Sequence, residues 1–540
     1  MPAPQTARTA ETSSASRFVR RPGTACAAVG TLAVAVRLLL LPLLPIPTPA
    51  IHDEFSYLLG ADTFASGRMA NPPHPMWVHF ETFHVNQQPA YASKYPPAQA
   101  LFLAFGQKFL GHPWFGVCLS MGLLFASLCW MLQGWVSPAY AVLTTAMAIL
   151  QWGVAGYGIL SPGYWANSYW GGAAAAMGGA LVIGAIPRLA RRISVAPALL
   201  GSLGLAIMAN SRPYEGAVTA AAAGAVLLWR MRRSGQPVNA LLRRQAILPF
   251  LLVMVPCGAA MAYYNYRLTG SAVLFPYTLN QRTYAASPHI YLLPPIAEPA
   301  YRHEHIRRFW TGWERDGYLQ ARAHPFRTMT ASLGWIGSFY LKNPLAIPAL
   351  LGLAVGGSME IAMALAIALP ALFSLLVAKS VLPHYYAPAF GALLILSAAG
   401  MQAIERRLPR IRRAGILLGL LCLGLTFGSC LFGLLEAYSS SRQTARGIEA
   451  RPLVAGRLER QGGRHLVIVR YSATHDNHQE WVYNAADIDA SPIVWAQDMG
   501  DEKNRELVRY YAGRRIWLLQ PDVDPLAPAP YAADGGPDRQ

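Results

Sequence analysis

Charged residues are scarce in this sequence. Asp, Glu, Lys and Arg together make up 13% of the 540 residues, whereas 54% are hydrophobic. Soluble globular chains carry about 25% charged residues, so the composition excludes a large water-soluble protein. Apolar runs near or above the length of a bilayer crossing recur from Thr24 to Leu435. They predict an α-helical polytopic membrane protein with about 10 to 12 transmembrane helices.

Cysteines are few, and the motifs of nucleotide-using enzymes are missing. All six cysteines lie in predicted spans or at their edges, where a thiol behaves as a small hydrophobic group and implies no disulfide framework. No glycine-rich phosphate loop, Walker lysine or dinucleotide fingerprint occurs in a soluble context. This lack argues against a nucleotide-activated sugar as substrate.

Acidic residues are outnumbered by basic ones, which gives a formal net charge of +18. The arginines cluster in short loops beside apolar runs, where they set membrane orientation, so we expect no binding of nucleic acid. The positive-inside rule assigns three clusters and the basic N-terminus, residues 1–23, to the cytosol. The clusters are Arg188 with Arg191 and Arg192; Arg230 with Arg232, Arg233, Arg243 and Arg244; and Arg406 with Arg407, Arg410, Arg412 and Arg413.

The opposite, external face then receives two long loops, residues 45–95 and 266–329, and everything after Tyr438. Successive spans of the transmembrane domain, residues 24–438, must place their loops alternately on the cytosolic and external faces. This condition is met only if one apolar run does not cross the membrane fully. That run is Ala98–Leu110, because about 13 residues make only about 20 Å of helix against a hydrocarbon core of about 30 Å. The predicted full spans are 24–44, 113–135, 139–159, 172–186, 195–209, 216–229, 246–264, 344–357, 359–378, 387–402 and 415–435.

The character of the sequence changes after the last span. Strand-like runs at 465–471, 493–496 and 516–520 surround a helix-like stretch at 502–511, which predicts a small α/β domain within residues 439–540. The Pro/Ala/Asp/Gly segment after Asp522 is typical of a disordered tail. With the orientation above, we expect a multi-pass protein of a bacterial inner membrane whose C-terminal domain is periplasmic.

Two adjacent acids, Asp53 and Glu54, follow the first span directly. Two adjacent carboxylates at a lipid interface are costly, and two interpretations are open. One interpretation is a solvated helix start, because acids are stabilised at the N-terminal dipole of a helix such as Phe55–Ser66. The other is a general base that takes the proton from an acceptor hydroxyl as it attacks an activated sugar.

A lysine closes the same loop, in Tyr91-Ala92-Ser93-Lys94-Tyr95-Pro96-Pro97. The prolines are typical of a helix start, and Lys94 at the interface is either a snorkelling anchor or a phosphate ligand. The second interpretation rests on the need of a departing phosphate for positive charge in a poorly solvated place, and spacing alone does not decide between the two.

Asp53-Glu54, Ser56-Tyr57, Gly67-Arg68 and Lys94 before Pro96-Pro97 resemble the first external loop of GT-C fold glycosyltransferases that use polyprenyl-phosphate sugars. The likeness is to the branch of protein O-mannosyltransferases and lipid A aminoarabinose transferase. It implies Asp53 as catalytic base and Lys94 as ligand of the donor phosphate, with Tyr95 departing from the family pattern.

Further polar groups fall on the same predicted face. Arg212 and Glu215 interrupt two spans, either as a structural salt bridge or as substrate ligands. Lys379, His384 and Tyr385 begin an external helix, either as interfacial anchors or as donors to the substrate. Glu54 and Tyr57 are expected to orient the acceptor or the sugar.

Metal ligands form no tight cluster in the sequence. His303-Glu304-His305 contains good ligand types, but residues two apart on a helix point to different sides. His74, His79 and His84 share a loop with Glu81, so a divalent ion there is an alternative that spacing does not support. No metal is assigned.

These observations predict an inverting hexosyl- or pentosyltransferase. Its expected partners are a polyprenyl-phosphate sugar donor, membrane lipids, and a glycan, lipid or protein acceptor. Lys94 with Arg212 or His384 would stabilise the leaving phosphate. The alternatives are a lipid or solute transporter, for which Arg37 and the pair Arg212/Glu215 would line a path, and a non-enzymatic protein that presents the C-terminal domain outside.

Overall fold

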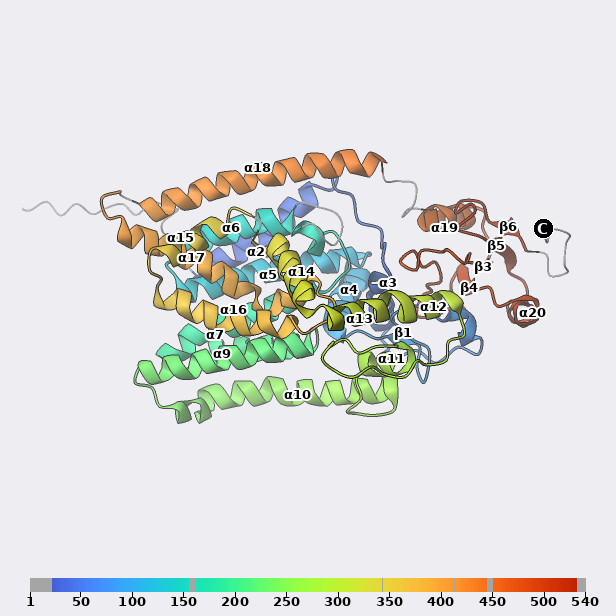
Figure 1. The fold of residues 1–540 in the computed structure, drawn as a ribbon, viewed down its shortest axis with the longest axis horizontal. Helices are drawn as coiled ribbons and strands as arrows, with labels where there is room; N and C mark the ends of the chain where they lie inside the picture. Colours follow the sequence, from blue (N-terminus) through green and yellow to red (C-terminus); the bar gives the residue numbers. More distant parts are fainter. Residues whose placement is uncertain (1–21, 155–161, 342, 412, 444–449, 532–540) are drawn as a thin grey trace, which may run out of the picture.

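The computed structural model describes residues 22–154, 162–341, 343–411, 413–443 and 450–531. Most of these residues form an elongated helical bundle, and a smaller α/β domain lies at one end of it (Figure 1). The predicted cytosolic segment before residue 22, Arg412 and the tail after residue 531 lie outside the described residues. The predicted fold class, a helical membrane protein with a small C-terminal α/β domain, is confirmed.

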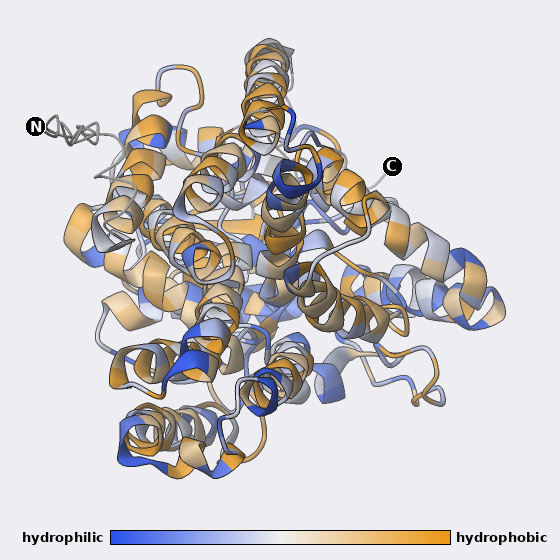
Figure 2. Cartoon of the chain, turned by 90° about the vertical axis from the view of Figure 1, so that its left-hand side faces the viewer, coloured by the Kyte–Doolittle hydropathy of each residue, from blue (hydrophilic) through white to orange (hydrophobic). Residues whose placement is uncertain are grey.

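The bundle helices follow the predicted apolar runs closely. They are α2 (Pro22–Leu39), α5 (Trp114–Trp135), α6 (Pro138–Gly153), α7 (Gly172–Arg191), α8 (Val195–Ala209), α9 (Pro213–Arg233), α10 (Arg244–Thr269), α15 (Ala346–Ala354), α16 (Met359–Leu375), α17 (Phe390–Arg407) and α18 (Ala414–Gln443). Seen from the end of the bundle, the helices are largely orange and pale, with hydrophilic residues at several of the near ends (Figure 2). The short run predicted to be incomplete is α4 (Pro97–Leu110), a helix of 14 residues.

Among the described helices, five are long and apolar enough to cross a membrane, and the bent pair α15 and α16 makes a sixth if it is one span. Helix α10 is only 11% buried over its apolar window, and α18 only 28%. Such exposed apolar surface suits contact with lipid. The α2 and α8 helices are apolar but shorter, so the higher predicted number of spans stays a prediction.

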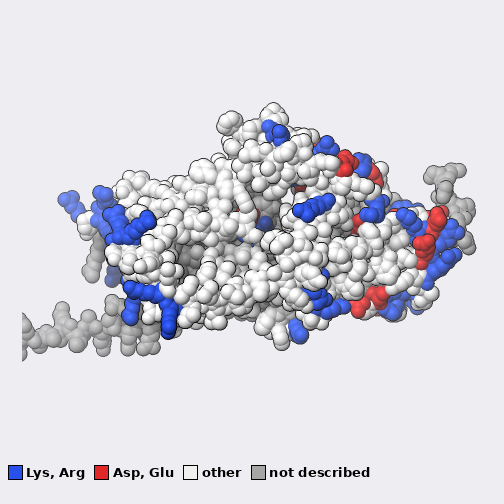
Figure 3. Space-filling view, turned by 90° about the horizontal axis from the view of Figure 1, so that it is seen from below, with Lys and Arg blue, Asp and Glu red and all other residues white. Residues whose placement is uncertain are grey.

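Charge separates the two ends of the molecule. Lys and Arg gather at the end of the bundle away from the α/β domain, a broad uncharged band follows, and the other end carries both signs (Figure 3). The loops after α9 and α17, which carry predicted basic clusters, lie at the basic end (Figure 1). This pattern agrees with the predicted orientation, although which face is cytosolic stays a prediction.

Small residues allow the helices in the centre of the bundle to approach closely. A Cβ atom at Gly179 of α7 would lie 1.8 Å from the carbonyl oxygen of Pro388. Only glycine therefore permits this contact between α7 and the 3₁₀ segment η5 (Pro383–Ala389), which carries His384 and Tyr385. The packing of η5 against α7 fixes the position of these two side chains.

The first external loop forms helix α3 (His52–Ala65), the 3₁₀ helix η1 (Trp77–Phe80) and a hairpin of β1 (Val85–Asn86) and β2 (Ala92–Ser93). Helix α3 is the helix predicted to follow Glu54, and its first turn carries the two acids Asp53 and Glu54. The second loop, for which no elements were predicted, contains α11 (Pro276–Tyr284), α12 (Glu304–Arg308), the π-helix η4 (Phe309–Glu314) and α13 (Arg315–Ala323), and is followed by α14 (Pro325–Tyr340).

The C-terminal domain has a four-stranded sheet in the order β4-β3-β5-β6. Strands β3 (His465–Val469), β4 (Ile493–Gln497) and β5 (Arg515–Leu519) are parallel, and β3 and β4 are buried along their whole length. Helices α19 (Ala450–Arg460) and α20 (Asp501–Tyr510) complete it. The expectation of disorder directly after Asp522 is wrong for the described residues, because β6 (Ala529–Pro530) pairs with β5.

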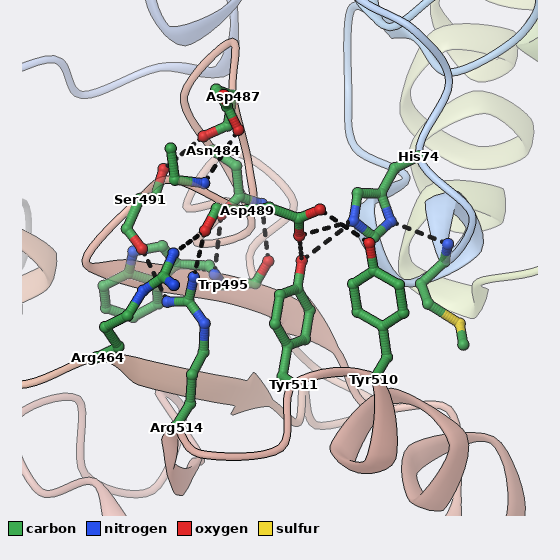
Figure 4. Close-up of polar contacts among 12 residues, drawn as sticks. His74, Arg464, Asn484, Asp487, Asp489, Ser491, Trp495, Tyr510, Tyr511 and Arg514 are labelled. Atoms are coloured by element: carbon green, nitrogen blue, oxygen red, sulfur yellow. Dashed lines mark hydrogen bonds and ion pairs between the residues drawn. The ribbon is translucent and has the colours of Figure 1, made fainter.

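The C-terminal domain is fixed to the first external loop by a hydrogen-bonded cluster (Figure 4). The Asp489 carboxylate lies 3.1 Å from His74 Nε2 and accepts hydrogen bonds from Tyr511 at 2.7 Å and Tyr510 at 2.8 Å. Its backbone carbonyl accepts from Arg514 at 2.7 Å. This cluster and the apolar contact of Phe80 and Val85 with the sheet place the domain directly above the loop that carries Asp53.

Candidate active site

Asp53 lies in the first turn of α3 and is surrounded by polar side chains from the same loop. Its Oδ1 accepts a short hydrogen bond from the Tyr95 hydroxyl. Its Oδ2 lies 3.0 Å from His52 Nδ1 and 3.7 Å from His84 Nε2. The Asp53 side chain is 18% exposed, whereas His52 and His84 are 5% and 6% exposed. Asp53 is thus the reachable group of this cluster.

Electrostatics keep Asp53 ionised. Burial raises the pKa of its carboxyl, but the neighbouring His84, the contact with His52 and the charge of Lys94 together bring the pKa well below its ordinary value. A charged carboxylate can accept a proton, which is the state that a general base requires.

Lys94 follows strand β2 and is 4% exposed. Its Nζ lies 2.6 Å from His84 Nδ1. The ammonium faces three aromatic rings, 5.1 Å from the centroids of Tyr95 and Tyr277 and 5.9 Å from that of Trp310. Burial lowers the pKa of Lys94 to about 8, although Asp53 and Glu314 oppose this shift. Lys94 therefore carries its charge at neutral pH in a poorly solvated place.

His84 connects the base to the lysine. An ammonium has no acceptor, so Lys94 donates to His84 Nδ1, and the neutral ring then carries its proton on Nε2, which faces Asp53. Burial and the charge of Lys94 lower the pKa of His84 well below its ordinary value, consistent with the neutral ring. The arrangement couples the position of Lys94 to that of Asp53.

Arg212 and Glu215 lie at the start of α9, on the same side of the bundle. Their closest atoms are 3.9 Å apart, and the guanidinium stacks 4.4 Å from the Tyr385 ring centroid. Burial opposes the charge of Arg212, but the neighbouring Glu215 raises the pKa of the guanidinium above its ordinary value. Arg212 thus adds a second permanent charge near Lys94.

The remaining predicted residues of η5 and the preceding turn lie beside this group. His384 is 2% exposed, and its Nδ1 is 2.7 Å from the Tyr164 hydroxyl. Lys379 forms an ion pair with Glu314 of η4 and donates to Ser287 Oγ at 3.0 Å. Glu314 therefore balances the charge of Lys379. Among the described residues, neither Lys94 nor Arg212 forms an ion pair with Glu314.

Glu54 differs from its neighbour Asp53, because all its described hydrogen bonds go to backbone. Oε2 accepts from the N–H of Ala50 at 2.8 Å and of Ile51 at 3.3 Å, and Oε1 accepts from Tyr169 at 3.0 Å. Burial raises the pKa of Glu54 to about 7, against the effect of these donors. Its contacts fix the start of α3, while its predicted role toward substrate stays a prediction.

Several residues of this site were missed by sequence reasoning: His52, Tyr95, Tyr277, Trp310 and Glu314. His84 was considered only as a metal ligand. Tyr95 had been noted only as a departure from a family pattern, yet it donates to Asp53 and stacks on Tyr57 with centroids 4.4 Å apart. The adjacency of His52 to Asp53 was the one local signal available. Nothing in the sequence links Glu314 to Lys379, because 65 positions separate them.

The histidines considered for metal binding separate in the structure. His303 lies 2.8 Å from the Val78 carbonyl and His305 lies 3.0 Å from Glu480. His74 contacts Asp489 and His79 the carbonyl of Gln497. Within the described residues, the group able to hold an ion is instead His52, Asp53 and His84, whose ligand atoms lie within 4.8 Å of one another. Their N and O donors suit a divalent transition ion, with Lys94 opposing its charge.

The arrangement of the helical bundle with the C-terminal domain at one end is the GT-C fold. The predicted fold family is confirmed by solved structures. ArnT from Cupriavidus metallidurans bound to undecaprenyl phosphate has a TM-score of 0.50 and 14% identity, over 91% of this chain and 93% of that chain. Its apo state has a TM-score of 0.50 and 13% identity, over 92% and 94%.

A more distant similarity is to the Archaeoglobus fulgidus oligosaccharyltransferase AglB in complex with an inhibitory peptide and a dolichol-phosphate. Its TM-score is 0.40 at 10% identity, over 92% of this chain and 69% of that chain. No protein-family model matches the sequence. A search of curated proteins likewise finds no match.

Proposed function

We propose that this protein is a membrane glycosyltransferase that moves a sugar from a polyprenyl-phosphate carrier to an acceptor on the external face of a bacterial inner membrane. The observation that carries the proposal is that one site combines an ionised, partly exposed acid, Asp53, with two buried cations, Lys94 and Arg212. The fold shared with ArnT, whose structure holds undecaprenyl phosphate, supports the choice of donor.

The leaving phosphate is assigned to Lys94 and Arg212. Both carry charge in a poorly solvated environment, where an ammonium or guanidinium stabilises a developing anion more strongly than in water. Neither has its charge fully used by a close acid, since Arg212 is 3.9 Å from Glu215 and Lys94 takes part in no ion pair among the described residues. His384, Tyr385 and Lys379 are assigned to the donor sugar and its phosphate.

The reaction is a single displacement. The acceptor oxygen attacks the anomeric carbon, the bond from that carbon to the phosphate oxygen breaks, and its electron pair stays on the phosphate. Asp53 takes the acceptor proton, and the configuration at carbon inverts. Tyr95 donates a hydrogen bond to Asp53 and holds the carboxylate in place, and Tyr57, stacked on Tyr95, positions it in turn.

The test uses full-length protein in lipid nanodiscs with a panel of radiolabelled polyprenyl-phosphate sugars. We expect release or transfer of one sugar by the wild type and a loss of about 10³-fold in Asp53→Asn, within the range for removal of a general base. The control is Asp316→Asn, an exposed acid of the second external loop. A substantially active Asp53→Asn protein contradicts the assignment, and lipid or solute translocation without any transfer favours the transporter.

A further inference from the structure

A cleft of about 380 Å³ lies between the C-terminal domain and the second external loop. One wall is α12 with the residues before it, and the other is formed by residues 469–473 and 497–498, which follow strands β3 and β4. Its volume falls within the range of small-ligand sites, about 300–1,000 Å³. The cleft is separate from the groups around Lys94 and Arg212, none of which line it.

The sheet topology places this cleft at a position suited to binding. The chain passes from β3 to β4 on one side and then crosses to β5 on the other side of β3. Ligands of open parallel sheets bind outside the carboxyl ends of the strands, and the cleft lies at this edge of the sheet, beside the point between β3 and β5 where the strand order reverses. The loops after β3 and β4, which line the cleft, leave from those carboxyl ends.

The charges that line the cleft leave one arginine without an acid. Asp498 is paired with Arg470, and Glu304 with Arg307, which points away from the lining set. Arg308 takes part in no ion pair among the described residues. Its guanidinium donates to the carbonyls of Ala473 and Ser472, and its buried Nε has no hydrogen-bond partner. A buried donor of this kind is costly unless a ligand accepts from it.

The same segments reach the active site. The π-helix η4 follows α12 directly and ends at Glu314, the partner of Lys379. The loop after β3 brings the His478 ring to 5.5 Å from the ring of His52, the neighbour of Asp53. A molecule held in the cleft therefore lies beside the segments that flank the base, on the side away from the lipid-embedded bundle (Figure 1).

We propose that this cleft binds an oxyanion of the acceptor, either a sugar carboxylate or a phosphate ester, with Arg308 as its principal ligand. The assignment rests on the proposed function, because it names the acceptor class of that reaction. A guanidinium is a charged donor that suits the oxygens of a carboxylate or phosphate. Arg302, 48% exposed at the rim, is a second arginine of the lining, 3.3 Å from Glu81.

The experiment measures binding by ligand-observed NMR to full-length protein in nanodiscs. The probes are galacturonic acid, glucose 6-phosphate, inorganic phosphate and glucose. We expect one or both sugar anions to bind, glucose not to bind, and Arg308→Gln to weaken the anion at least tenfold. Glucose 6-phosphate that binds while galacturonic acid does not would identify a phosphate ester, galacturonic acid alone would identify a carboxylate, and inorganic phosphate measures how much of the binding comes from the phosphate group. The control, Arg327→Gln, changes an exposed arginine that lies outside the cleft and in no ion pair among the described residues, and should bind as the wild type.

A second variant covers the case in which loss of Arg308 disturbs folding. Ala473→Trp fills the cleft but keeps the backbone carbonyl that accepts from Arg308, and should also abolish anion binding. Anion binding unchanged in both variants overturns the cleft. Donor hydrolysis without acceptor is measured in parallel and should be unaffected by Arg308→Gln. A wild type that never consumes a donor overturns the acceptor role together with the proposed function, whereas donor turnover without anion binding overturns the cleft alone.

Discussion

The polar clusters around Asp53 and Asp489 both involve the first external loop, yet they are balanced differently. Each carboxylate oxygen of Asp489 has a close donor: Tyr510 donates to one, and Tyr511 and His74 contact the other. The contact with His74 joins the C-terminal domain to the first external loop. Around Asp53, the buried cation Lys94 contacts a histidine and aromatic rings instead of an acid. A closed network stabilises docking, whereas an unbalanced cation in a buried place suits a charged substrate.

After Asp53→Asn, the largest effect should come from removing the unbalanced cation. Lys94→Met keeps most of the side-chain volume and removes the charge, and we expect kcat/KM for the donor to fall about 100-fold, or about 2.7 kcal/mol in transition-state stabilisation. Lys108→Met, an exposed lysine near the end of α4, is the control. A loss below threefold in Lys94→Met would place the phosphate elsewhere.

The pH dependence of donor binding should follow the same lysine. Because the pKa of Lys94 is about 8, its charge is present below pH 8 and is lost as the pH rises through that value. We expect the apparent Kd for the donor to rise about tenfold per pH unit above pH 8. Lys94→Arg, charged throughout this range, should show no such rise, and an equal rise in both proteins would assign the titration to another group.

A smaller effect, on stability, is expected from Glu54→Gln. The amide replaces one acceptor oxygen by a donor among the N–H groups of Ala50, Ile51 and Tyr169, and we expect the free energy of unfolding to fall by about 2 kcal/mol. Thermal unfolding in nanodiscs measures it. Glu298→Gln, which removes an exposed ion pair with Arg315, should change stability by less than about 0.5 kcal/mol. Equal stability in both variants would contradict the positioning role of Glu54.

The smallest effect should come from the closed network. Asp489→Asn keeps one carbonyl acceptor for Tyr511 and His74, so we expect a loss of about 1 kcal/mol in stability and donor turnover within twofold of the wild type. Turnover and unfolding measured on one preparation distinguish the two effects. A large loss of turnover with stability unchanged would show that this cluster also serves the reaction.

Much of the fold was readable from the sequence, because length, apolarity and helix-start prolines are local properties. The run at 195–209 was predicted with the bounds that α8 has, and the parallel strands with bounds within two residues. The second external loop was not readable, since its helices are short and polar and gain stability from packing on other segments. Its residues Tyr277, Trp310 and Glu314 were missed for that reason.

The sequence by itself determined that the chain is a helical membrane protein, that an acid pair and a lysine flank its first external loop, and that a small α/β domain follows. Spacing along one chain carries this information. Only the tertiary structure decided that Asp53 and not Glu54 is the reachable acid, that Tyr95 and His84 hold it, and that Glu314 neutralises Lys379 but not Lys94. These roles depend on burial and on partners brought together from distant positions, which local pattern does not encode.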